Sequence, residues 1–225
     1  METWHLGLAA IILWSEPLQA DLTIEQRVEE PGGRRPAAEI RLKIKGQKIR
    51  ADLSTEVTLL MDTATGDTTT LFHTRKTALH LNGSTARLFQ KEIERFPAPE
   101  EPPKLVATGR QETVSGHETE IYTMESGSIK MTWWIARKES EWDKYHPQIA
   151  LLRQTPMVRL AEGLRCLPAE CELPGLAVKT ELCTPDKRRI IITLTAIKEE
   201  PLENADFAIP PGYRPLTEPL PPLTR

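Results

Sequence analysis

The run from Leu173 to Tyr213 constrains this chain most, because its side chains alternate with the period of a β-strand. Between Arg188 and Ile197 the even-numbered and odd-numbered positions form two faces rich in β-branched residues. This pattern is typical of a strand with at least one buried face. A second strand-like segment precedes it, across a turn signal at 184–187. The run therefore predicts a β-hairpin, which we expect to close one edge of a larger sheet.

The end of the same run contains two prolines and a glycine between aromatic residues. Pro210-Pro211 should stop further strand pairing, and Gly212 permits the turn that places Tyr213. We expect Phe207, Ile209 and Tyr213 to latch this last segment onto the rest of the domain.

The first half of the chain repeats the alternation in short amphipathic segments separated by turn signals. The predicted strands are 22–28, 40–45, 49–53, 57–61, 68–73 and 77–81. Gly46-Gln47, between two alternating runs, predicts a two-residue hairpin of type II′. A meander of such strands has one wet and one dry face, and the dry face must be covered.

Two segments are candidates for that cover. Ser84 can cap a helix from Thr85 to about Arg95, and a Pro-rich crossing loop, 96–104, follows it. A second helix is predicted around Trp142, Tyr145, Ile149 and Leu152, kinked or restarted at Pro147. Beyond the loop the β pattern resumes at 117–124 and 128–136. The sequence thus predicts a mainly β, α+β domain whose antiparallel sheet carries one or two covering helices.

The two ends of the chain differ from the middle. Residues 1–20 contain an apolar stretch, Trp4 to Trp14, too short to span a bilayer. We interpret 1–20 as a signal peptide despite its lack of Lys and Arg, the alternative being an N-terminal core helix or strand. We expect a single domain over 21–214, a Pro-rich tail over 215–225, and export to the periplasm or the medium, with no transmembrane segment in the mature chain.

Charge limits the choice of partners. The chain has 225 residues with 29 basic and 32 acidic side chains. This near-neutral balance gives no reason to expect a nucleic-acid partner or an anionic membrane surface.

Three cysteines follow the predicted signal peptide: Cys166, Cys171 and Cys183. In an exported protein two of them are expected to pair. Cys166 with Cys171 closes the shortest loop, and Cys171 with Cys183 is equally allowed. A metal site is disfavoured because the chain has no CxxC and no histidine near these residues in sequence.

Catalytic motifs are missing from the sequence. His117-Glu118 opens like HExxH, but Ile121 stands where the second histidine is needed, and the segment reads as a strand. There is no G-x-S-x-G, Walker A or G-x-G-x-x-G motif. We therefore expect no enzyme and no cofactor, with a hydrolase assembled from distant residues as the least favoured alternative.

Aromatic and aliphatic side chains suggest where a ligand would bind. A predicted apolar pocket under the covering helices is lined by Trp133, Met131, Ile135, Phe89, Ile93 and Trp142. The simpler alternative is a solid core, since large side chains are what a dry sheet face needs.

Four sequence motifs follow one another in the second half of the chain: the hairpin from Gly109 to Tyr122, the segment Trp134-Ile135-Ala136, the strand Leu176 to Lys179 and the closing Phe207 to Tyr213. In this order they resemble the pattern of a bacterial family known as domain of unknown function 4412 (DUF4412). The cysteines at 166–183 and the lack of a Met-rich first half depart from it.

The resemblance implies a strongly curved antiparallel sheet, a half-barrel like that of the LolA/LolB group, with helices in its concave side. It also implies a lipid or other apolar ligand in the concavity, or an envelope protein as partner. An interaction domain with a solid core and no ligand is the alternative.

Overall fold

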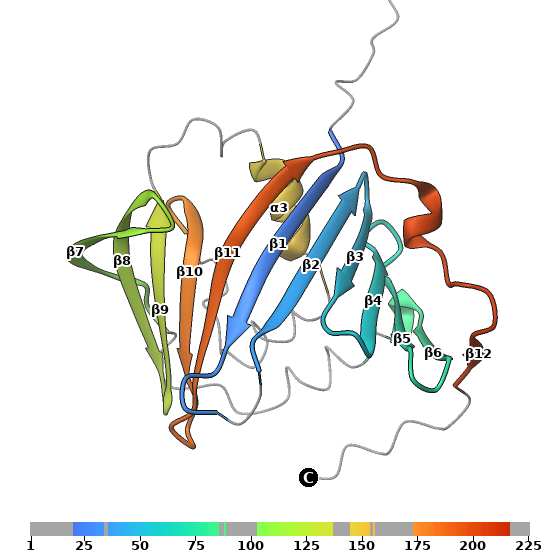
Figure 1. Ribbon diagram of the computed structural model, residues 1–225, viewed down its shortest axis with the longest axis horizontal. Helices are drawn as coiled ribbons and strands as arrows, with labels where there is room; N and C mark the ends of the chain where they lie inside the picture. The colour runs from blue at the N-terminus through green and yellow to red at the C-terminus, as the bar shows by residue number, and fades with distance from the viewer. Residues whose placement is uncertain are drawn as a thin grey trace, which may run out of the picture.

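The fold is one sheet of twelve strands in the order β12-β6-β5-β4-β3-β2-β1-β11-β10-β9-β8-β7 (Figure 1). The computed structural model describes residues 20–33, 36–85, 88, 103–136, 145–153, 155 and 173–216. Neighbouring strands run antiparallel throughout, except that β12 lies parallel to β6. The strands are β1 (Leu22–Glu29), β2 (Ala38–Lys45), β3 (Lys48–Asp52), β4 (Val57–Asp62), β5 (Asp67–Phe72), β6 (Thr77–Leu81), β7 (Val106–Val114), β8 (His117–Ser126), β9 (Ile129–Ala136), β10 (Leu176–Cys183), β11 (Arg189–Glu199) and β12 (Arg214–Pro215).

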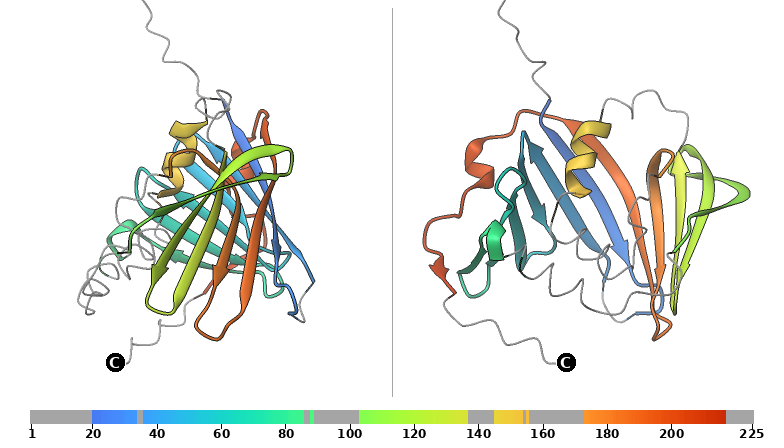
Figure 2. Two further views of the ribbon diagram at one scale, coloured as in Figure 1. Left: turned by 90° about the vertical axis from the view of Figure 1, so that its left-hand side faces the viewer. Right: turned by 180° about the vertical axis from the view of Figure 1, so that it is seen from behind.

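The predicted meander is confirmed from β1 to β6, with each strand paired to the next in sequence. The turn between β2 and β3 has Gly46 at φ +55°, and Gln47 has no positive φ, as a type II′ turn requires. Seen from the side and from behind, the sheet curves into an open half-barrel (Figure 2). The predicted fold class is therefore confirmed.

The position predicted for the terminal hairpin is wrong. β10 and β11 lie in the middle of the sheet, where β11 pairs with β1 and β10 pairs with β9. The hairpin therefore joins the two halves of the sheet, and the edges are β7 and β12. Period-two alternation shows that a strand has a buried face, but it does not identify the strand's partners, so the sheet order could not be derived from it.

Three irregularities interrupt the strand pairing. The register shifts between Glu25 and Gln26, between Ala177 and Lys179, and between Ala107 and Gln111. A β-bulge bends the strand that contains it and increases the local twist. These shifts therefore help a sheet of this width to curve rather than remain flat.

Helix α3 (His146–Arg153) lies on the concave side, against β11, β1 and β2 (Figure 2). Pro147 falls in its first turn, where its missing N–H costs no hydrogen bond. Residues 137–144 lie outside the described ranges, so the choice between a kink and a restart stays a prediction. A second helix begins at Gly83 to Thr85. Its cap is Asn82 rather than Ser84, since Asn82 Oδ1 accepts from the Thr85 backbone N–H at 2.8 Å. Most of the predicted helix 85–95 lies outside the described residues.

The C-terminal strap, residues 200–216, returns from β11 past β3 and β4 to β6 (Figure 1). It contains a 3-10 helix, η1 (Asn204–Phe207), and ends in β12. Tyr213 packs against a small cluster of Leu60, Leu71 and Ala78, so the predicted latch is present at this residue. Ile209 is 48% exposed and contributes little to it.

Candidate functional site

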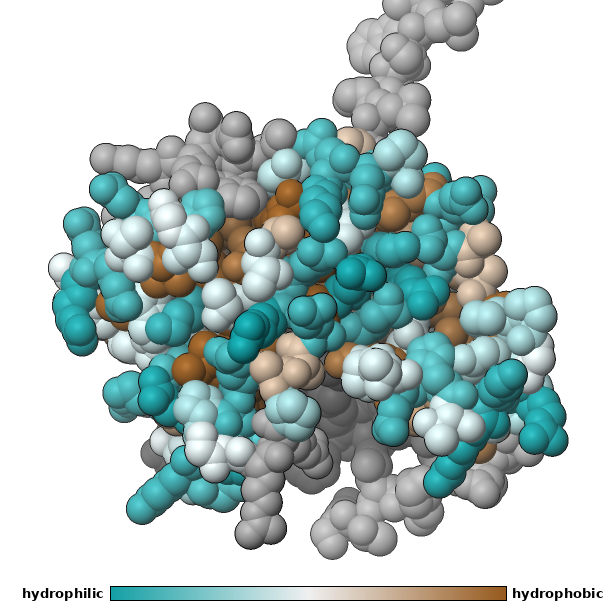
Figure 3. All heavy atoms as spheres, in the orientation of Figure 1, coloured by the Kyte–Doolittle hydropathy of each residue, from teal (hydrophilic) through white to brown (hydrophobic). Residues whose placement is uncertain are grey.

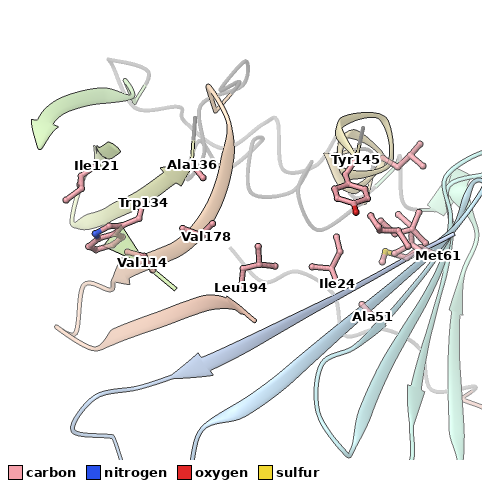
Figure 4. Close-up of a cluster of buried hydrophobic side chains, with 14 residues drawn as sticks. Ile24, Ala51, Met61, Val114, Ile121, Trp134, Ala136, Tyr145, Val178 and Leu194 are labelled. Carbon is pink, nitrogen blue, oxygen red and sulfur yellow. The ribbon is translucent and has the colours of Figure 1, made fainter. Parts of the chain in front are cut away.

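The inner face of the sheet, meaning the face on which α3 packs, is apolar across β1 to β4. Ile24, Ile44 and Met61 are buried in one cluster with Tyr145 and Leu151. Tyr145 projects from the start of α3 towards these strands (Figure 4). Seven apolar side chains packed against the cluster stay half-buried: Leu42, Leu53, Leu59, Ile149, Leu152, Leu176 and Ile197. The inner face therefore keeps apolar surface beyond its closed core.

Two polar side chains, Gln148 within α3 and Thr155 just after it, are buried with the apolar side of the helix. Tyr145, Gln148, Leu151 and Thr155 recur every three or four residues and are all buried. The Gln148 side-chain nitrogen donates to the Ala20 carbonyl at 3.2 Å. Its oxygen, Oε1, is buried and has no hydrogen-bond partner among the described residues.

The outer face of the same strands is charged, and hydrophilic side chains dominate it over β1 to β3 (Figure 3). Glu25 forms ion pairs with Arg41 at 3.2 Å and Lys198 at 3.0 Å. The Lys198 ammonium, which donates to Glu25, is the largest cause that lowers the pKa of this carboxyl below its usual value. The inner and outer faces of β1 to β4 thus differ sharply in polarity.

Ion pairs also fix the start of the strap. Lys43 donates to Asp206 at 2.7 Å and lowers the pKa of that carboxyl. Arg50 donates to the Asp206 backbone oxygen at 2.9 Å. These contacts hold η1 against β2 and β3.

Three of the six predicted pocket residues come together. Trp133 and Ile135 are buried in a second cluster with Tyr122 and Met124, and Met131 packs against it. Phe89, Ile93 and Trp142 lie outside the described residues. The pocket under the covering helices therefore stays a prediction.

Of the three cysteines, the structure describes only Cys183, a free thiol whose sulfur lies 3.8 Å from Glu181 Oε1. Cys166 and Cys171 lie outside the described residues, and their pairing stays a prediction.

His117 and Glu118 lie at the start of β8, so the interpretation of this segment as a strand is confirmed. Neighbouring side chains in a strand point to opposite faces, which is unlike the arrangement of a helical zinc motif. Within the ranges that the structure describes, no group of three or more His, Cys, Asp or Glu side chains could hold a metal ion.

A polar chain that the sequence did not predict links β3, β4, the turn after β5 and the strap. Thr58 Oγ1 donates to Asp52 at 2.6 Å and lies 2.8 Å from His73 Nε2. Nδ1 of the same histidine contacts the Tyr213 hydroxyl. Thr58 gives its proton to Asp52, so a neutral imidazole at His73 donates from Nε2 to Thr58 and accepts at Nδ1 from the Tyr213 hydroxyl. These residues are far apart in sequence, and only the fold brings them together.

A hollow of about 140 Å³ lies where the strap passes β3 to β5. Its lining combines aliphatic, aromatic and charged side chains: Lys48, Ile49, Leu60, Met61, Asp62, Asp67, Thr69, Phe207 and Ile209. None of the three predicted pocket residues that the structure describes lines it. Among the helices in the described ranges, none is both long enough and apolar enough to cross a membrane.

A family model described as a domain of unknown function (DUF4412) matches residues 28–213. No curated protein matches the chain. Two solved structures of PNGF-II match with TM-scores of 0.44 and 0.40 at 9% identity, over 88% and 87% of this chain. The chain covers 31% and 30% of the PNGF-II chains. The LolA superfamily protein NE2245 from Nitrosomonas europaea matches with a TM-score of 0.30 at 8% identity, over 86% of this chain and 91% of that one. Similarities this low carry no information about function.

Proposed function

Because this chain belongs to the DUF4412 family, whose description names no function, we propose from its own geometry that it is a non-enzymatic, exported protein that binds a lipid or another apolar ligand on the inner face of its half-barrel. The observation that carries the proposal is the half-buried apolar surface around α3, on a sheet whose outer face is charged. Covering such surface with an apolar ligand is favourable by about 25 cal/mol per Å² removed from water.

The half-buried side chains around α3 support one place for this ligand. Leu42 and Leu59 on the strands and Ile149 on α3 are half-buried side chains that pack on the same cluster. An acyl chain lying between α3 and β2 to β4 would contact all of them. Export is supported by the apolar segment at 4–14 and the polar strand sequence that begins at Asp21.

The test is binding of a dansyl-labelled fatty acid, together with mass spectrometry of lipids extracted from the purified protein. Leu42→Trp fills the proposed site, and Arg41→Trp places the same bulk on the outer face of the same strand. We expect Leu42→Trp to weaken binding at least tenfold and Arg41→Trp to leave it unchanged. If repeated extractions yield no lipid and the wild-type protein does not bind the dansyl-labelled fatty acid, the proposal is wrong.

An interaction domain with a solid core is the second candidate. The burial of Ile135 at 0% and Met124 at 1%, in the same cluster as Trp133, favours it, because side chains this enclosed are typical of a packed core. In that case the Pro-rich tail 215–225 would carry the interaction. Deleting 217–225 would then abolish capture of a partner, whereas lipid binding would survive the deletion.

A further inference from the structure

The buried side-chain oxygen of Gln148 limits the chemical class of ligand that fits the inner face. This inference rests on the proposed ligand-binding function. We infer that the ligand carries an uncharged hydrogen-bond donor, a hydroxyl or an amide N–H, that meets Gln148 Oε1 beside α3. An apolar chain alone would fill the inner face and leave this oxygen unmatched.

Gln148 is enclosed by the fold rather than placed at its surface. The residue is 5% exposed and shares the buried side of α3 with Tyr145 and Leu151, both members of the inner-face cluster. Within the described chain, Oε1 is buried and accepts no hydrogen bond. Most buried polar atoms in folded proteins do have a partner, so an orphaned one in an apolar setting calls for a physical reason.

The orientation of the amide is fixed by its other end. The side-chain nitrogen donates to the Ala20 carbonyl at 3.2 Å, and exchanging nitrogen and oxygen would set two acceptors against each other. The atom without a partner is therefore the oxygen, which can only accept. A ligand group that matches it must donate.

This requirement distinguishes lipids that have the same hydrocarbon chain but different head groups. A long-chain alcohol, a monoacylglycerol or a fatty amide offers O–H or N–H and would satisfy Oε1. An ionised carboxylate offers only acceptors, and its charge would also have to leave water. We therefore expect a neutral amphiphile with a donor to bind more tightly than the fatty-acid anion of equal length.

A buried water molecule is the rival occupant. Water would satisfy the same oxygen, but it would do so whatever lipid is bound. Dependence of affinity on the ligand's donor therefore distinguishes the two.

The experiment is a competition titration against the dansyl-labelled fatty acid with three C16 ligands: 1-hexadecanol, hexadecyl methyl ether and palmitate. In the wild-type protein we expect hexadecanol to bind about tenfold more tightly than the ether, the value of one buried hydrogen bond. In Gln148→Met, which keeps the length of the side chain, the two should bind equally. Gln148→Asn, which withdraws the oxygen by one methylene, should lose the same preference.

Thr155→Val is the matched control. Thr155 follows α3 and is also buried, but its hydroxyl already donates to the Leu152 carbonyl at 2.7 Å. It should keep the preference for hexadecanol, and thermal melts check that each variant folds. Equal binding of hexadecanol and the ether by the wild-type protein would overturn the inference while leaving the proposed function standing. Failure of all three ligands and of the dansyl probe to bind would overturn both.

Discussion

The two halves of the sheet handle their two faces differently. From β1 to β4 the inner face is apolar and the outer face carries ion pairs, so water solvates one side. In β9 the neighbours Trp133 and Trp134 point to opposite faces, yet they are only 6% and 8% exposed. The second half of the sheet is therefore apolar on both faces at this strand.

Because β9 is apolar on both faces, other parts of the chain must cover both of them. Trp134 Nε1 donates to Glu112 of β7 at 2.7 Å, and Lys179 of β10 lies 3.9 Å from the centre of its ring. Val114, at the end of β7, is buried in the same cluster as Trp134. The bend of β7 at its register shift, which includes Gly109 at φ +71°, brings these groups to the indole. The phrases Gly109 to Tyr122 and Trp134-Ile135-Ala136 thus meet in a structural contact.

The largest expected effect comes from emptying either face of β9. Trp133→Ala and Trp134→Ala should each lower the free energy of unfolding by about 3–5 kcal/mol, because each removes a buried indole. Urea denaturation of the two variants measures this directly. A loss below about 1 kcal/mol for either one would mean that β9 has a single packed face and that the two halves do not differ.

In the first half of the sheet, substitutions on the two faces of one strand should lower the free energy of unfolding by unequal amounts. Ile44→Ala removes a fully buried inner side chain and should cost about 3 kcal/mol, whereas Lys43→Ala on the outer face should cost about 1 kcal/mol or less. The same urea titrations apply. Similar losses for both variants would contradict the assignment of a wet outer face.

A smaller effect is expected at the strap, which covers part of the first half's outer face. Tyr213→Phe keeps the ring on Leu60 but removes the hydroxyl that donates to His73, at a cost of about 1 kcal/mol. Hydrogen exchange should accelerate at Arg214 and Leu216, whose amides bond to β6 and the turn before it. Unchanged exchange there would show that the polar chain does not hold the strap.

The smallest effect is a pH dependence at the start of the strap. Lys43 lowers the pKa of Asp206, so this ion pair stabilises the folded state fully above the usual aspartate pKa. The stabilisation should disappear as the pH falls below about 4, through the lowered pKa. Exchange of the η1 amides should then increase in the wild-type protein but change little in Asp206→Asn. Equal acid sensitivity of the two proteins would rule out this carboxyl as the cause.

Local pattern was enough to predict the strands, because alternation reports directly on a half-buried strand. The sheet order was not predictable, since β1 and β11 pair although they lie near opposite ends of the domain's sequence, and alternation does not identify a strand's partner. The helix cap was misassigned because Asn82 and Ser84 are both good caps, and the choice depends on where the chain leaves β6.

The candidate site was predictable only in part. Alternation correctly placed Trp133, Met131 and Ile135 on one face of β9. It places Trp134 with Lys130 and Thr132 on the opposite face, and no sequence pattern shows that β7 covers this indole. Gln148 has no sequence signal as a ligand group: only its position between Tyr145 and Leu151 on the packed side of α3 reveals it.

Hydrogen–deuterium exchange with and without the dansyl-labelled fatty acid tests the central claim, that the inner face is the binding surface. We predict slower exchange in α3 and in β2 and β3 on ligand addition, with no change in the β7–β8 hairpin. No protection of α3 at saturating ligand would contradict the claim. Protection confined to Phe207 to Tyr213 would also contradict it and would move the site to the hollow beneath the strap.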